Sequence, residues 1–251
     1  MNFIAMLRLE LLRLRVRPFG WVLLALGIGW LGWNFTLMVG SFLASQVQRA
    51  GLPDSPGYVD LVAVPLLGAL AQLAFLVVPL LGMSTLAGER RNGTLAVLLA
   101  SGVPASRIVL GKYAALVLWL LVWLALTLAM PLSLAHATSP DWGKLAAATL
   151  GLFLMLASLS AIAVAASAFT SHPALAAVVG LLVGLGLWTL NLGAQRAGID
   201  DGAINAIAMS THVQNLLRGL VSSTDLLWFV LVIAACLALA TRRIATDRER
   251  G

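Results

Sequence analysis

Charge is the first thing that this sequence lacks. Only 10% of its 251 residues are charged and 61% are apolar, whereas soluble globular chains carry about 25% charged residues. A chain of this length cannot bury so much apolar surface in one water-soluble core. The composition therefore excludes an ordinary soluble domain and predicts a protein whose solvent is a lipid bilayer.

Cysteine and histidine are nearly absent. Cys236 is the single cysteine and lies in an apolar run, so no intrachain disulfide can form and no metal-ligand spacing exists. The three histidines, His136, His172 and His212, fall in different loops. No His-Glu-x-x-His motif occurs, and no long apolar run carries a central Asp or Glu. The sequence therefore argues against an intramembrane protease.

A phosphate-binding loop is missing too. Gly111-Lys112-Tyr113 lacks the upstream glycine and the hydroxyl residue of Gly-x-x-x-x-Gly-Lys-[Ser/Thr]. We therefore expect that the chain is not an enzyme, that another polypeptide hydrolyses any ATP, and that no cofactor or metal binds here. The net charge of +6 comes from basic residues scattered at the ends of apolar runs, which does not fit a nucleic-acid-binding face.

Long apolar runs are what the sequence has in abundance. A helix needs about 20 apolar residues to cross a hydrocarbon core of about 30 Å. Six runs are suitable: 19–43, 61–86, 113–134, 145–170, 174–192 and 226–241. The last is short and can extend backward through Ser222 and Ser223. We predict an all-α, multi-pass membrane protein with six transmembrane helices in a single domain spanning 1–251.

The basic residues predict the orientation. If the N-terminus is cytoplasmic, twelve Lys and Arg fall in inside segments and four fall outside, namely Arg49, Lys144, Arg196 and Arg218. The positive-inside rule then places both termini in the cytoplasm of a cell's inner membrane.

Residues 1–17 are predicted to form a helix that does not span the membrane. Phe3, Ile4, Leu7, Leu11 and Leu14 recur at helical spacing, while the charged residues lie off this stripe. This pattern is typical of an amphipathic helix in the membrane interface. The alternative is a simple charged stop before the first span.

The predicted inside loop 89–107 has a pattern of charged, turn-forming and helix-capping residues. Its first residues, Glu89, Arg90 and Arg91, form a charged boundary, and Gly93 permits a turn. Thr94 is expected to cap a short helix.

That short helix has one apolar face, made by Leu95, Leu98 and Leu99. Gly102 and Pro104 are expected to end it, and Ser106 to cap a second helix that runs into the third span. Because the short helix is too apolar on one face to stand in water, it needs either the membrane or a groove on a partner.

The predicted outside segment 193–225 contains two further short apolar helices. Asp200 or Asp201 can cap the first, and Ser210 or Thr211 the second. Neither helix is long enough to cross, which suggests a hairpin dipping into the outer leaflet.

Charged residues follow in the same segment. Arg218 and Asp225 can pair, and Asp225 can cap the last span. His212 lies six residues from Arg218, so the two share no close helical face. This segment is either a structural cap and hairpin or a part of a gate.

The pattern Glu-Arg-Arg-x-Gly-Thr-x-x-x-Leu-Leu, followed by Pro and then Gly-Lys, resembles permease subunits of ABC exporters in the type-2 permease superfamily. Their fold is shared with ABCG-type exporters. The resemblance implies that 89–107 holds a coupling helix that docks on an ATPase subunit. The residues implied are Glu89, Arg90, Arg91, Gly93, Thr94, Leu95, Leu98, Leu99 and Pro104.

The segment with His, Arg-Gly and Asp before the last span is similar to the gliding-motility branch of that superfamily. There it forms re-entrant helices that close the outer end of the pathway. The gate residues implied here are His212, Arg218, Gly219 and Asp225.

The resemblance further implies half of a transporter. A second permease subunit, identical or paralogous, would pack through the second and fifth spans, and two ATPase subunits would bind ATP and magnesium. Alternating access would then export a hydrophobic or amphipathic cargo. The alternative is an ion-coupled secondary transporter or channel, which usually needs an ionisable group at mid-span. The predicted spans carry no charge at their centres.

Overall fold

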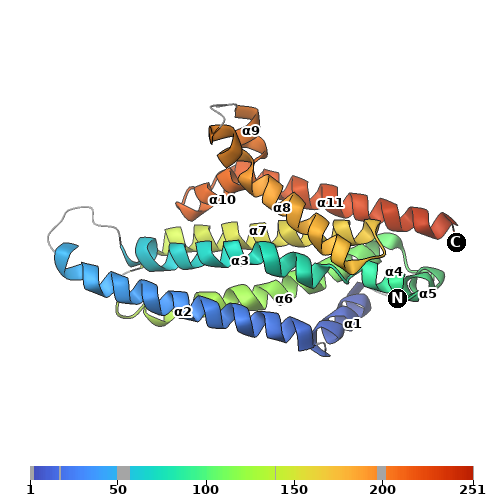
Figure 1. Ribbon diagram of the computed structural model, residues 1–251, viewed down its shortest axis with the longest axis horizontal. Helices are drawn as coiled ribbons and strands as arrows, with labels where there is room; N and C mark the ends of the chain where they lie inside the picture. Colours follow the sequence, from blue (N-terminus) through green and yellow to red (C-terminus); the bar gives the residue numbers. More distant parts are fainter. Residues whose placement is uncertain (1–2, 17, 50–56, 139, 197–201, 251) are drawn as a thin grey trace.

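A computed structural model describes residues 3–16, 18–49, 57–138, 140–196 and 202–250, and every regular element in these ranges is helical. Figure 1 shows long helices that run side by side, with short helices at both ends. The elements in order are α1 (Phe3–Val16), α2 (Pro18–Arg49), the π-helix η1 (Val59–Ala63), α3 (Val64–Gly82), α4 (Ala87–Arg91), α5 (Thr94–Ala100), α6 (Ala105–Ser133), α7 (Trp142–Phe169), α8 (Pro173–Arg196), α9 (Gly202–Ile207), α10 (Met209–Leu217) and α11 (Ser223–Arg250).

The prediction of six spans is confirmed. Six helical stretches of the described chain are long and apolar enough to cross a membrane. They are Pro18–Gln46, Val59–Arg91, Ala105–Ser133, Trp142–Phe169, Pro173–Asn191 and Ser223–Glu249.

The last helix is longer than the sequence predicted. Its apolar run stops at Thr241, but α11 continues to Arg250. Hydropathy finds the part of a helix that lies in lipid, and a helix can continue into water on charged residues that form helices well. The predicted span 226–241 therefore lies within a longer helix.

Burial separates inner helices from outer ones. In its most apolar stretch α7 has 78% of its residues buried and α3 has 61%, whereas α2 has 11% and α8 and α11 have 17% each. In Figure 1, α3, α6 and α7 accordingly lie between α2 on one side and α8 and α11 on the other. The outer helices therefore present apolar surface to lipid or to a partner.

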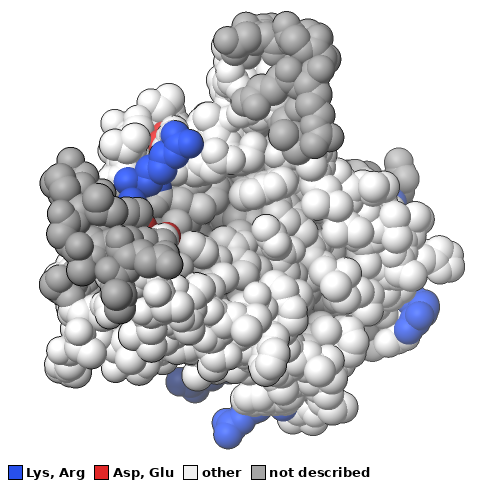
Figure 2. Space-filling model, turned by 60° about the vertical axis from the view of Figure 1, so that its left-hand side comes forward, with Lys and Arg blue, Asp and Glu red and all other residues white. Residues whose placement is uncertain are grey.

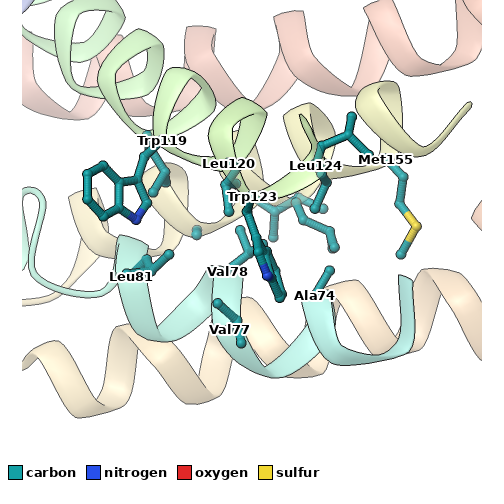
Figure 3. Close-up of a cluster of buried hydrophobic side chains, with 14 of the residues drawn as sticks. Ala74, Val77, Val78, Leu81, Trp119, Leu120, Trp123, Leu124 and Met155 are labelled. Atoms are coloured by element: carbon teal, nitrogen blue, oxygen red, sulfur yellow. The ribbon is translucent and has the colours of Figure 1, made fainter. Parts of the chain in front are cut away.

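The core between α3 and α6 is built around Trp123, which is 2% exposed. Figure 3 shows it among side chains of both helices, with Met155 of α7 beside them. The other labelled residues are Ala74, Val77, Val78 and Leu81 of α3 and Trp119, Leu120 and Leu124 of α6. Since lipid tails are as apolar as leucine, close packing rather than removal from water favours these contacts.

The two ends of the bundle differ. The start of α1, the helices α4 and α5 and the end of α11 lie together at what we call the basal end (Figure 1). The π-helix η1, the start of α7, the α9–α10 pair and the start of α11 lie toward the opposite, distal end. Figure 2, with the distal side turned forward, shows a surface that is largely neither acidic nor basic. The predicted inside loop 89–107 and the described part of the predicted outside segment 193–225 thus lie toward opposite ends of the bundle.

Candidate functional site

The 89–107 loop forms the expected short helix, α5, with Gly102 and Pro104 after its end. Its start differs from the prediction in detail, because Gly93 rather than Thr94 is the N-cap. Gly93 has φ 72°, a backbone conformation that a glycine adopts without steric cost. Thr94 is the first helical residue, and its hydroxyl donates to the carbonyl oxygen of Glu89 at 3.3 Å. α6 likewise begins at Ala105 after a Pro104 cap, so Ser106 is not the cap either.

The apolar face of α5 is covered by the chain itself. Leu95 is 5% exposed, and Leu98 and Leu99 pack partly buried against the core. This face therefore needs neither lipid nor a partner groove, which corrects the expectation from the sequence. The opposite side remains free, since Val97 is 72% exposed. Arg91 at the end of α4 is exposed as well.

A buried ionic cluster lies behind this loop. The Lys112 ammonium is 2.9 Å from Oε1 of Glu10 and 2.9 Å from Oε1 of Glu89. Arg13 pairs with both carboxylates, at 2.9 Å from Glu10. The four residues, which we call the basal cluster, come from α1, α4 and α6 and carry balanced charges. The Lys112 side chain is 1% exposed and those of Glu10 and Glu89 about a tenth.

The two carboxylates stabilise the charged form of Arg13. Burial lowers the pKa of Arg13, but the charge of Glu10 and the charge and hydrogen bond of Glu89 outweigh it, so its pKa is raised overall. Glu89 is thus buried and paired within the chain. Sequence reasoning did not find Glu10, Arg13 or Lys112. The signal available was Glu10, the one acidic residue of an otherwise basic α1.

At the distal end, His212 of α10 is the centre of a second buried cluster. Its Nδ1 is 2.6 Å from Oδ1 of Asp225 on α11, and its Nε2 is 3.1 Å from the carbonyl oxygen of Ala206 on α9. Side-chain exposure is 8% for His212 and 5% for Asp225. These contacts join three helices, and we call the group the distal cluster.

Neighbouring groups complete the distal cluster. Asn215 donates to both carboxylate oxygens of Asp225, at 3.4 Å each. The indole of Trp228 stacks on the imidazole with ring centroids 4.9 Å apart, and Phe229 contacts both rings edge-on. The aromatic rings therefore shield the His212–Asp225 contact from solvent.

The expected pairing of Arg218 with Asp225 is wrong. The Asp225 carboxylate is occupied by His212 and Asn215, and Arg218 ends α10 as an exposed residue. Asp225 lies in the first turn of α11 and is not its cap. A carboxylate at this position still interacts favourably with the helix dipole.

The structure does not confirm the caps predicted for the two short helices. Asp200 and Asp201 lie outside the described residues. α10 begins at Met209 after an Ala208 cap, so neither Ser210 nor Thr211 caps it.

Gly219 makes the turn between α10 and α11. Its φ is 87°, and a Cβ there would lie 3.4 Å from Cγ of Lys144, at the start of α7. Lys144 in turn pairs with Asp60 of η1. The turn therefore holds the distal cluster against η1 and α7.

In the part of the chain that the structure describes, no group of three or more His, Cys, Asp and Glu residues could hold a metal ion. The polar clusters are salt bridges and hydrogen-bond networks at the two ends of apolar helices. Such networks do not by themselves catalyse a reaction, and they are compatible with a channel or conduit.

Residues 43–242 match the model of a family described as ABC-2 family transporter protein. The chain belongs to this family. It is therefore the multi-pass membrane permease of an ABC transporter, and in this family ATPase activity resides in separate subunits. This sets aside a transporter that works without an ATPase. No curated protein matches the sequence. The matched stretch of the permease begins at the end of α2 and stops within α11, before that helix ends.

Proposed function

We propose that the permease is a subunit of an ATP-driven exporter and that α5 docks on the ATPase subunit as a coupling helix. The observation that carries this proposal is the free side of α5 at the basal end. Val97 is 72% exposed there, between turns at Gly93 and Gly102 that both have positive φ. An exposed apolar side chain on a short surface helix fits a groove on a partner protein.

The predicted coupling residues then divide into two groups. Arg91 and Thr94 are exposed and, with Val97, supply direct contact to the ATPase. The remaining residues hold the helix in place by burial, pairing or turn geometry: Glu89, Arg90, Gly93, Leu95, Leu98, Leu99 and Pro104. Glu89 ties the start of this loop to α1 and α6 through the basal cluster.

The distal cluster is proposed to close the other end of the pathway. His212 and Asp225 tie α9 and α10 to α11. Gly219 supplies the turn. Arg218 is exposed at the distal end of the proposed pathway. With the basal end in the cytoplasm, as the positive-inside rule predicts, α9 and α10 form the re-entrant outer gate. Breaking the His212 contacts would release both short helices together.

A second permease subunit, a copy of this chain or a paralogue, would complete the pathway. α3 and α8 are proposed to form the interface, and α8 exposes Leu182 to 63% along its outer side. The cavity between such apolar helices suits a hydrophobic or amphipathic cargo.

The test is binding of the ATPase subunit to matched variants of the full permease. Val97→Lys should abolish copurification, because a charge cannot enter an apolar groove without a partner. Leu220→Lys is the control, since Leu220 is 62% exposed at the distal end. Equal binding by both variants would overturn the docking role of α5.

The orientation needs its own test. In a Cys236→Ala background, single cysteines at Thr94 and Leu220 should react with an impermeant thiol reagent from opposite faces of the membrane. Labelling of both from one face would disprove the proposed arrangement.

A further inference from the structure

The part of α11 beyond its apolar run has no role in the function proposed so far. Residues 243–250 lie after the family match, which stops at residue 242, yet they continue the helix without a break. Ile244 in this extension is completely buried. The extension is therefore packed against the protein and is not a loose tail.

Two consecutive residues of the extension contact the 89–107 loop. Asp247 pairs with Arg90 of α4. Arg248 donates from one guanidinium nitrogen to the carbonyl oxygens of Leu99, at 3.3 Å, and of Val103. The loop is thus bound on both sides of α5, before the helix starts and where it ends.

These contacts compensate for two weaknesses of α5. With seven residues it is too short to be a stable helix by itself. The carbonyl groups of its last turn have no partners within the helix. A cation near them donates hydrogen bonds to these groups and interacts favourably with the helix dipole. Arg248 meets both needs at Leu99.

The turns on either side of α5 make its position depend on such contacts. Gly93 has φ 72° and Gly102 has φ 74°, and an added Cβ would meet nothing within 4 Å at either. Open glycine turns allow a helix to pivot. Without an attachment, a push on α5 would be absorbed at these turns and would not reach the spans.

We propose that Asp247 and Arg248 are positioning residues that fix the 89–107 loop to α11, so that movement of α5 is passed to α11. The inference rests on the proposed docking of the ATPase at α5. α11 runs unbroken from Asp225 in the distal cluster to this attachment, and its 28 residues span roughly 40 Å at 1.5 Å per residue. One rigid helix thereby links the two ends of the permease.

Hydrogen–deuterium exchange of the full permease in lipid nanodiscs tests the attachment. Arg248→Gln should raise the exchange of α5 amides by about tenfold, because local opening controls exchange in short helices. Arg242→Gln is the matched control, an exposed arginine on the same helix, and should leave α5 unchanged. Equal exchange in the two variants would overturn the proposal.

A double-variant cycle separates pairing from general damage. Asp247 also contacts Arg243 on its own helix at 3.4 Å, so neutral substitutions are used. Arg90→Gln and Asp247→Asn should each raise α5 exchange, and the double variant should raise it by less than the two effects combined. Independent, additive effects would show that the Arg90–Asp247 pair does not position the loop.

The transfer of movement is measured in the complex with the ATPase subunit. Adding ATP should change the exchange of α10 in the wild type and in Arg242→Gln, and Arg248→Gln should weaken that change at least about threefold. An undiminished response would overturn the transfer. Failure of the attachment and failure of the docking are distinguishable: loss of α5 protection in the isolated permease tests the attachment alone, and Val97→Lys tests the docking alone.

Discussion

The basal and distal clusters are both buried, but they are held together in different ways. The basal cluster balances two carboxylates against a lysine and an arginine, and it joins α1, α4 and α6. The distal cluster has one carboxylate and one imidazole, packed between aromatic rings, and it joins α9, α10 and α11. The first is a network in which two carboxylates share two basic partners, whereas the second depends on the contacts of one imidazole.

The geometry at His212 makes that dependence explicit. One ring nitrogen contacts the Asp225 carboxylate and the other contacts the carbonyl oxygen of Ala206. A single side chain therefore makes both contacts that join α10 to α9 and α11. The difference suggests a permanent joint at the basal end, where force would enter, and a releasable contact at the distal end.

The largest expected effect breaks the basal cluster. Lys112→Met leaves two buried carboxylates with Arg13 alone, and removing one partner of a buried ion pair costs about 3–5 kcal/mol. Lys144→Met is the control, because its pair with Asp60 is partly exposed and should cost at most about 1 kcal/mol. Unfolding in detergent measures both, and equal losses would contradict the comparison.

The sequence could predict the spans but not this cluster. Six apolar runs are visible in composition alone, and so is the short helix that begins at Thr94. Glu10 and Lys112 are 102 residues apart, and nothing in either local pattern shows that α1 lies against α6. Pairing across such a distance is set by packing, which hydropathy does not contain.

The distal prediction failed for a related physical reason. Arg218 and Asp225 looked like partners because they are close in sequence and opposite in charge. The turn at Gly219 instead brings the buried face of α10 to α11, so that Asp225 meets His212, 13 residues away. The direction in which a side chain points decides which residue it pairs with. That direction depends on the residue at which each helix starts. His212 and Asp225 were both among the predicted gate residues, but their contact was not predicted.

The second expected effect removes the imidazole. His212→Ala leaves the Asp225 carboxylate buried with only the long Asn215 contacts, and hydrogen bonds to charged groups contribute about 1.5–3 kcal/mol. The loss should be smaller than for Lys112→Met, because one charge rather than two loses its partner. Unfolding under the same conditions checks the order, and a larger loss for His212→Ala would reverse the proposed ranking of the two ends.

The smallest expected effect concerns the turns beside the two clusters. Gly219 and Gly93 both have positive φ, so an alanine at either position costs about 1–2 kcal/mol of backbone strain. Gly219 also packs against Lys144, whereas an added Cβ at Gly93 would meet nothing within 4 Å. Gly219→Ala should therefore raise the exchange of α10, while Gly93→Ala should change α5 alone. If Gly219→Ala instead left α10 protected, the distal turn would not support the cluster, and the contrast between a fixed and a releasable end would rest on His212 and Asp225 only.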